Sequence, residues 1–306
     1  EAPDRKQAPM ESSRIALVVD SCTDVPPEDI ERFGMYVVPL QVNYRDETFL
    51  DKVTITPQQV YDRFAEEVPT TSTPTPAIAR EVLQRVVDDG YEQAVVVTIS
   101  SGLSATYDLM RSVASGVAGL ECAIVDTRSI GMGAGLVALA VARMLADGAS
   151  LADVRRESER IVRDTKVFFC VDTLEYLHKG GRIGKVTGRA ANMLGLKPMI
   201  LFKDGEIFSG GVARGRQKSF EKALEQLMNY LDAHGGTPDD YRITVGYGYD
   251  EEEGKRLWMQ TRAALRAKYP GAQCEVGLLQ IGCTIAVHTG PYALGMGVMR
   301  RWKKQN

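Results

Sequence analysis

Short apolar segments alternate with amphipathic ones through the first half of the chain. Four apolar runs have the length and β-branched content of buried strands, at residues 14–20, 35–42, 94–100 and 122–126. The run AVVVTIS at 94–100 shows no polar alternation until its end, which is typical of a central strand in a parallel sheet. The segments between and after these runs predict helices, at residues 26–33, 56–67, 76–89, 107–116, 131–147 and 150–164. This βαβα order predicts a parallel sheet with helices on both faces.

The pattern changes after residue 165, where predicted strands follow one another directly. Two of them, at 199–203 and 206–210, form a hairpin around Asp204-Gly205. The other strands are predicted at 167–171, 243–247, 273–279 and 284–289, with helices at 188–194, 214–234 and 252–268. Adjacent hairpin strands indicate a mixed sheet. We therefore predict an α/β fold with a disordered tail at 1–13, a parallel-sheet α/β/α domain at 14–165 that carries the binding loops, and a smaller mixed-sheet α/β domain at 166–306.

Composition narrows the classes of function. The 306 residues are 44% hydrophobic and 25% charged with a formal net charge of −3, which does not favour nucleic acid or an anionic membrane surface as a partner. No apolar run reaches the ~18 residues of a membrane-spanning helix, and the polar start lacks the apolar core of a signal peptide. The cysteines form no CxxC pair and have apolar neighbours, so we expect buried thiols in a reducing cytoplasm and no zinc site. They are Cys22, Cys122, Cys170, Cys274 and Cys283.

Two clusters of hydroxyl side chains occur where predicted elements end. One is TTSTPTP at 70–76, and the other is SSGLSAT at 100–106, directly after the strongest predicted strand. Ligands of open α/β sheets lie beyond the carboxyl ends of the strands, and both clusters precede predicted helices, whose free N–H groups favour an anion. The clusters suit a carboxylate better than a triphosphate, because no G-x-x-x-x-G-K-[ST] run is present. The alternative interpretation is that these residues are helix N-caps.

Two further segments carry candidate binding residues. His288, one of three histidines, ends the strand predicted over 284–289, where it either reaches the charged head of a ligand or has a structural role. The segment DTLEYLHKGGRIGK at 172–185 places Lys179, Arg182 and Lys185 among glycines on a predicted loop. Such a basic loop either guides an anion or docks an acidic partner, or is a solvated turn.

Five segments, in this order, resemble signatures of the DegV family. They are DSCTD at 20–24, TSTPT at 71–75, ISSGLSATY at 99–107, DTLEYLHKGGRIG at 172–184 and HTGP at 288–291. The resemblance covers nearly the whole chain from about residue 14 onward. It implies a two-domain α/β binding protein, not an enzyme, that encloses one long-chain fatty acid such as palmitate, stearate or oleate, with no cofactor and no metal. It also implies that the protein is the acyl-carrying subunit of a bacterial fatty acid kinase. This subunit would present the acid to a separate catalytic subunit, which forms the acyl phosphate. Transient contact with a membrane would allow lipid exchange.

The resemblance also implies roles for individual residues. The carboxylate would be received by Thr71, Ser72, Ser101 and Ser104, with His288 nearby. Arg182 would lie on the loop that faces the partner. Two residues depart from the family pattern, since Ala105 and Tyr292 stand where S-G-T and H-T-G-P-G have glycine. We expect Ala105 to crowd the backbone slightly and Tyr292 to narrow the head-group end.

The wall of the cavity is harder to assign. Residues 131–145 and 191–202 are candidates, because both are strongly apolar and contain methionines that adapt to a flexible chain, namely Met132, Met193 and Met199. The alternative is ordinary core packing.

A serine hydrolase is the main alternative function. GLSAT at 102–106 follows a predicted strand and opens a helix, like a loose nucleophile elbow without its second glycine. The order Ser104, then His288, fits this class, and the acid between them would be Asp126, Asp172 or Asp250. A nucleotide or sugar-phosphate protein has less support, because no G-x-G-x-x-G follows the first strand.

Overall fold

The computed structural model describes residues 14–186 and 195–304. The tail predicted over 1–13, the helix predicted over 188–194 and Met193 lie outside the described residues. Within those two ranges, no helix has both the length and the apolar content needed to cross a lipid bilayer.

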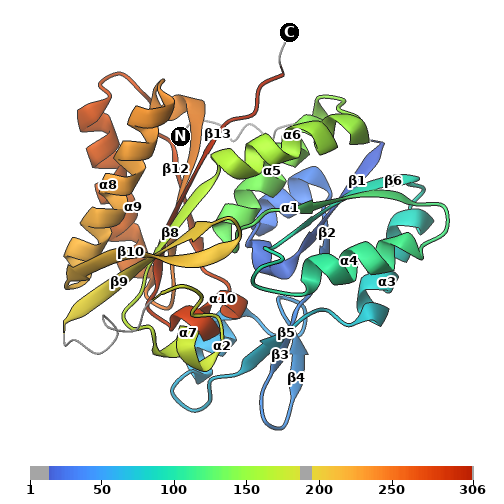
Figure 1. Ribbon diagram of the computed structural model, residues 1–306, viewed down its shortest axis with the longest axis horizontal. Helices are drawn as coiled ribbons and strands as arrows, with labels where there is room; N and C mark the ends of the chain where they lie inside the picture. The colour runs from blue at the N-terminus through green and yellow to red at the C-terminus, as the bar shows by residue number, and fades with distance from the viewer. Residues whose placement is uncertain (1–13, 187–194, 305–306) are drawn as a thin grey trace, which may run out of the picture.

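The first half of the chain contains a four-stranded parallel sheet, whose strands lie in the order β2-β1-β6-β7. Side chains alternate between its two faces: Leu17 and Val19 of β1 pack toward one set of helices, and Val18 packs toward the other. Helices α3 and α4 cover one face, whereas α5 and α6 cover the other, and α1 connects β1 to β2 (Figure 1). The bounds are β1 (Ile15–Asp20), α1 (Pro27–Phe33), β2 (Tyr36–Val38), α3 (Pro76–Asp88), β6 (Gln93–Thr98), α4 (Thr106–Ser115), β7 (Glu121–Asp126), α5 (Met132–Ala146) and α6 (Leu151–Asp164).

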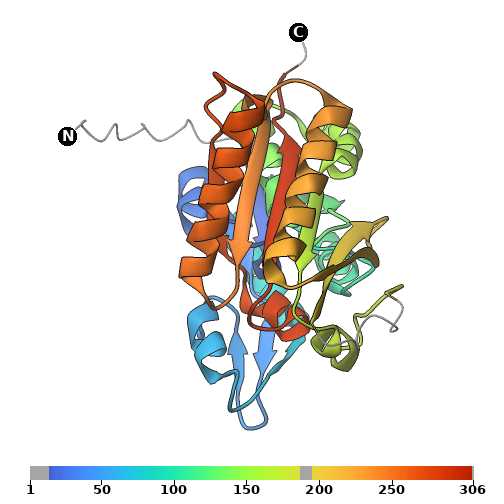
Figure 2. The same ribbon diagram turned by 90° about the vertical axis from the view of Figure 1, so that its left-hand side faces the viewer.

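A six-stranded mixed sheet forms after residue 165, in the order β10-β9-β8-β13-β11-β12. Only β11 and β12 pair in parallel; the other neighbours are antiparallel. Helices α8 and α9 lie along its outer face, which Figure 2 shows toward the viewer. The bounds are β8 (Lys166–Cys170), α7 (Glu175–Lys179), β9 (Leu196–Lys203), β10 (Glu206–Arg214), α8 (Arg216–His234), β11 (Tyr241–Tyr247), α9 (Glu251–Lys268), β12 (Val276–Gln280), α10 (Cys283–Thr289) and β13 (Leu294–Arg300).

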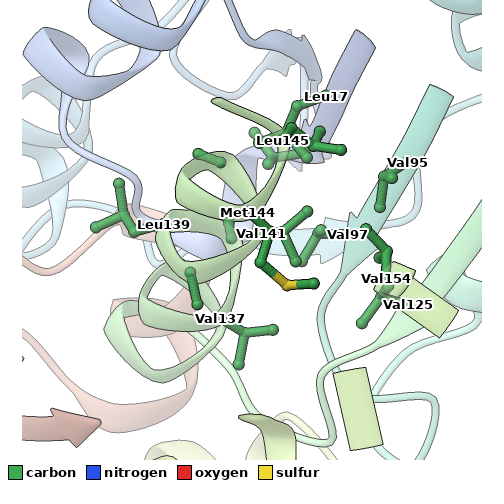
Figure 3. Close-up of a cluster of buried hydrophobic side chains, with 14 of the residues drawn as sticks. Leu17, Val95, Val97, Val125, Val137, Leu139, Val141, Met144, Leu145 and Val154 are labelled. Atoms are coloured by element: carbon green, nitrogen blue, oxygen red, sulfur yellow. The ribbon is translucent and has the colours of Figure 1, made fainter. Parts of the chain in front are cut away.

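Helix α5 lies between the two sheets and packs on both. Toward the parallel sheet, Val137, Val141 and Met144 meet the valines of β6 and β7 (Figure 3). Toward the mixed sheet, a Cβ on Gly295 would come within 2.6 Å of Met132 Cε, and one on Gly297 within 3.0 Å of Leu136 Cδ1. The glycines of β13 therefore let α5 approach this sheet closely. An apolar surface almost all round α5 is what this position requires.

A small third sheet, in the order β4-β3-β5, lies at the bottom of Figure 1 together with α2. The single strand predicted over 35–42 is divided between β2 of the parallel sheet and β3 of this one, with Pro39 and Leu40 between them. The cluster at 70–76 is thus not wholly a loop, because its first three residues form β5. The bounds are β3 (Gln41–Asn43), β4 (Thr48–Leu50), α2 (Pro57–Arg63) and β5 (Thr70–Ser72).

The prediction of a strand over 284–289 is wrong, because this segment forms the helix α10. Its β-branched, apolar sequence TIAVHT imitates a buried strand, but the helix is itself buried on nearly all sides. The final strand is β13 instead, whose two glycines weaken the strand signal. The predicted parallel sheet, mixed sheet and hairpin at Asp204-Gly205 are confirmed. The division of the chain into two domains near residue 165 stays a prediction.

Candidate functional site

A cavity of about 320 Å³ lies beyond the ends of β1 and β6, under α10 and the β9–β10 hairpin. From β1 the chain crosses to β2 on one side, whereas β6 lies on the other, so these two ends bound the crevice where α/β sheets bind ligands. The volume falls in the range of small-molecule sites. Most of the lining is apolar: Leu40, Ile99, Leu103, Ile130, Phe169, Leu177, Ile200, Phe202, Ile207 and Ile285, beside Cys22.

Asp20 joins the two strand ends at the floor of the cavity. It is 1% exposed, and its carboxylate accepts hydrogen bonds from the backbone N–H groups of Cys22 at 2.8 Å and Ile99 at 2.8 Å. Burial raises the pKa of Asp20 to about 7, although both backbone N–H groups and the Lys52 charge oppose the shift. Because Cys22 and Ile99 both line the cavity, Asp20 sets the position of its inner wall.

Asp24, four residues later, fixes α10 against this floor. Its Oδ1 accepts from Lys52 Nζ at 2.7 Å, and its Oδ2 accepts from the backbone N–H of Gly282 at 3.0 Å. Lys52 Nζ also donates to the carbonyl of Ser21 at 2.7 Å. Gly282 is the residue before α10, so this contact sets where the helix begins. From the sequence, Asp20 has no predicted role, and Ser21 with Asp24 predicts a capping-box-like start for the helix near 26–33. That prediction is wrong, because the N-cap of α1 is Pro26, without a side-chain hydrogen bond.

The more exposed end of the cavity gathers polar side chains from four parts of the chain. The "polar end" comprises Thr71, Ser72, Ser104, Arg182 and His288. Thr71 Oγ1 lies 3.2 Å from His288 Nε2, which brings β5 and α10 together. Ser104 Oγ lies 2.8 Å from Thr106 Oγ1, and the Arg182 guanidinium donates to the carbonyls of Gly180 at 2.8 Å and Leu103 at 3.4 Å.

His288 is neutral at physiological pH. Burial, together with the positive charge of Arg182, lowers the pKa of His288 to about 4. Its Nδ1 is buried without a hydrogen-bond partner in the described part of the chain, and it faces Gly180 so closely that a Cβ there would overlap the ring. Arg182 is therefore the cation of the polar end, with His288 and the hydroxyls as neutral hydrogen-bonding groups.

The β9–β10 hairpin covers one side of the cavity with Ile200, Phe202 and Ile207. Its tip touches the loop after β6, where Ser100 Oγ donates to the carbonyl of Gly205 at 2.7 Å. A Cβ on Gly102 would lie 2.6 Å from that same carbonyl oxygen, so glycine is needed where the hairpin docks. The arrangement, an apolar chamber with one polar end, suits a molecule with a long apolar part and one anionic group.

The family model described as "Uncharacterised protein, DegV family" matches residues 14–301. This chain belongs to the DegV family. A DegV domain-containing protein of Clostridium acetobutylicum is 32% identical over 289 residues, which are 94% of this chain and 99% of that protein. Two solved structures are also similar. A fatty acid (stearic acid)-binding protein from Eubacterium ventriosum has 33% identity and a TM-score of 0.84, covering 94% of this chain and 98% of its own. A fatty-acid-binding DegV family protein from Thermus thermophilus has 32% identity and a TM-score of 0.82, covering 94% and 99%.

In this DegV chain, Ser101 is not part of the cavity lining. It is exposed, and its hydroxyl donates to Asp126 Oδ2 at 2.5 Å, on the outer side of the loop that presents Ser104. Arg182, in contrast, is both exposed and part of the lining, although the sequence prediction placed it only on a partner-facing loop. Tyr292 is 45% exposed, packs edge-to-face against Tyr249 and is absent from the lining, so it does not narrow the polar end.

The predicted cavity wall needs correction. None of residues 131–145 lines the DegV cavity, because α5 is occupied by packing between the two sheets. From 191–202, Ile200 and Phe202 do line it, whereas Met199 belongs to the core beneath α8. Ala105 does lie in the lining, beside Ser104.

The hydrolase alternative lacks a contact that its mechanism needs. A catalytic triad requires an acid on the second ring nitrogen of the histidine, and His288 Nδ1 has no partner among the described residues. The three candidate acids are engaged elsewhere: Asp126 with Ser101, Asp172 with Arg216, and Asp250 with the backbone of Glu253. Across residues 14–186 and 195–304, no group of three or more His, Cys, Asp or Glu side chains could hold a metal ion.

Proposed function

We propose that the protein binds one long-chain fatty acid, with its carboxylate at the polar end and its alkyl chain in the apolar part of the cavity. The observation that carries this proposal is the grouping of hydroxyls, a neutral His288 and a cationic Arg182 at one end of a chamber otherwise walled by Ile, Leu and Phe. The Eubacterium ventriosum and Thermus thermophilus relatives, which bind fatty acids, support it.

The energetics are consistent with tight binding. Each buried methylene contributes about 0.8 kcal/mol, so the roughly fourteen methylenes of palmitate contribute on the order of 11 kcal/mol. Association and ordering of the chain take back several kcal/mol. An unpaired carboxylate would cancel the remainder, because burying an isolated charge is very costly. Hydrogen bonds from Thr71 and Ser104 and the charge of Arg182 would stabilise it.

We further propose that the protein is a carrier that presents this carboxylate to the catalytic subunit of a fatty acid kinase, which forms the acyl phosphate. Support comes from the family resemblance and from Arg182, which is exposed and also lines the cavity. A planar guanidinium in that position can contact the ligand and a phosphate or acidic group of a partner together.

The lipid-binding proposal is tested by native mass spectrometry of the purified protein, followed by denaturing extraction. We expect one fatty acid per chain. Thr71→Val and Ser104→Ala should each weaken stearic acid binding about 10- to 100-fold, because each removes a hydrogen bond to a charged group. Thr70→Val and Ser101→Ala are matched controls outside the lining. Equal affinity of the site variants and their controls would contradict the head-group assignment.

The partner proposal is tested with a bacterial fatty acid kinase catalytic subunit, ATP and acid-loaded protein. Arg182→Ala should slow acyl phosphate formation at saturating lipid more than Lys185→Ala, an exposed basic residue of the same segment outside the lining. Equal rates for the two variants would exclude Arg182 as the partner contact.

A further inference from the structure

The hydroxyl group of Thr284 stands apart from the others in the cavity. Thr284 is 2% exposed and lines the cavity, yet its Oγ1 has no hydrogen-bond partner in the part of the chain that the structure describes. Thr289, the other buried threonine of α10 in the lining, donates to the carbonyl of Ile285 at 3.2 Å. Buried hydroxyls without partners are rare because they lose their hydrogen bonds to water.

Thr284 and His288 are four residues apart on α10, so they lie on one face of the helix. Their separation along the axis is about 6 Å, from a rise of ~1.5 Å per residue. Thr284 therefore lies one helical turn from the carboxylate position, on the buried side. That distance corresponds to the first few carbons of an acyl chain.

The thiol of Cys22, which also lines the cavity, is a polar neighbour of Thr284. Burial and the nearby Asp20 and Asp24 carboxylates raise the pKa of Cys22 well above its usual value, so the thiol stays protonated. The Thr284 hydroxyl acts in the opposite direction and lowers that pKa, but a thiol is only a weak hydrogen-bonding partner. The rest of the nearby lining, including Ile285 and Phe169, is apolar.

We propose that Thr284 is a second polar subsite, which binds a hydroxyl group close to the carboxyl end of the fatty acid. This inference rests on the proposed function, since the carboxylate must lie at the polar end. A hydroxyl group both donates and accepts, so it complements the hydroxyl of Thr284. The preferred ligands are then 3-hydroxy fatty acids, and an unsubstituted acid leaves Thr284 unpaired.

The test compares stearic acid, 3-hydroxystearic acid and 12-hydroxystearic acid by isothermal titration calorimetry on delipidated protein. We expect 3-hydroxystearic acid to bind about tenfold more tightly than stearic acid, which corresponds to about 1.4 kcal/mol. The 12-hydroxy isomer should bind no more tightly than stearic acid, because its hydroxyl lies too far from the carboxylate.

Two variants locate the preference. Thr284→Val keeps the shape of the side chain and should abolish the preference for the 3-hydroxy acid, measured as the ratio of the two dissociation constants within the same variant, with folding checked by Tm. Thr284→Ser retains the hydroxyl and should keep the preference. Equal binding of stearic and 3-hydroxystearic acids by the native protein, or a preference that survives in Thr284→Val, would overturn this subsite and leave the proposed function intact. Failure of the native protein to bind any of the three acids would refute both.

Discussion

Gly180 gives a sharp test of whether His288 contacts the ligand head group. The backbone at Gly180 has φ −78°, which alanine adopts readily, so Gly180→Ala perturbs the protein only through its added methyl group. That methyl would overlap Nδ1 of His288, lie 2.8 Å from its Cε1 and lie 3.1 Å from the backbone carbonyl oxygen of Tyr176. An ordinary van der Waals contact is about 3.5 Å, and Nδ1 is the nearest ring atom, so the ring must turn or retreat by about 1 Å or more.

Either movement breaks the alignment of Nε2 with Thr71, which lies at 3.2 Å, and removes the imidazole from the carboxylate position. A hydrogen bond to a charged group contributes about 1.5–3 kcal/mol, so stearic acid affinity should fall about 10- to 150-fold. Binding is measured by titration calorimetry, with folding checked by circular dichroism.

Gly116→Ala is the matched control. Gly116 also follows a helix with a negative φ of −97°, and its added methyl would meet only the carbonyl of Val113, at 3.5 Å. It carries the same small change in chain entropy and should leave affinity unchanged. If Gly180→Ala folds normally and binds stearic acid as tightly as Gly116→Ala, His288 is not part of the head-group site.

Three further predictions concern the framework of the site. Burial holds the pKa of Asp20 at about 7 in the folded protein, against ~3.9 unfolded, so the folded state retains a proton that the unfolded chain loses. Stability should therefore fall as pH rises from about 4 to 7, by on the order of 4 kcal/mol, and Asp20→Asn should flatten this slope in urea unfolding. Lys52→Met leaves the buried Asp24 carboxylate without its cation and should destabilise by about 2–3 kcal/mol; a second change, Asp24→Asn, should restore part of this loss in a double-mutant cycle. Ser100→Ala leaves the carbonyl of Gly205 unsatisfied and should lower the free energy of unfolding by about 1–3 kcal/mol. Relative to the native protein, amide hydrogen exchange should become faster at the hairpin tip by more than it does in β8.

The parts of this fold that sequence reasoning predicts well are those with strong local signals. The run AVVVTIS became the central strand β6, and Asp204-Gly205 formed the hairpin turn, with both residues at the positive φ that such turns require. Sequence reasoning failed at α10 because burial on nearly all sides removes helical periodicity, leaving only a β-branched run. It missed β13 because glycines are unusual inside a strand. Gly295 and Gly297 are there because α5, which is remote in sequence, packs closely against them.

The binding site shows the same limit. Ser101 and Ser104 carry the same hydroxyl in the same loop, and only the fold decides that Ser101 turns outward to Asp126 while Ser104 lines the cavity. The role of Asp24 depends on Gly282, which lies 258 residues away in sequence. The apolar character of α5 correctly predicted burial, but that character is shared by core and cavity wall, so it could not tell one from the other.

The position of α5 restricts how a guest molecule can be loaded. Both sheets pack on one helix that has no hydrophilic face. Separating them would expose a large apolar surface to water, so we expect the two sheets to move as a single rigid unit. The hairpin is attached differently. Its tip contacts the loop after β6 through the Ser100 hydroxyl and Gly102 and lies beside Arg128, and Lys185 donates to the carbonyl of Ile207 and pairs with Glu206. We therefore expect a lipid to enter on the hairpin side, where local opening would leave the two sheets in place.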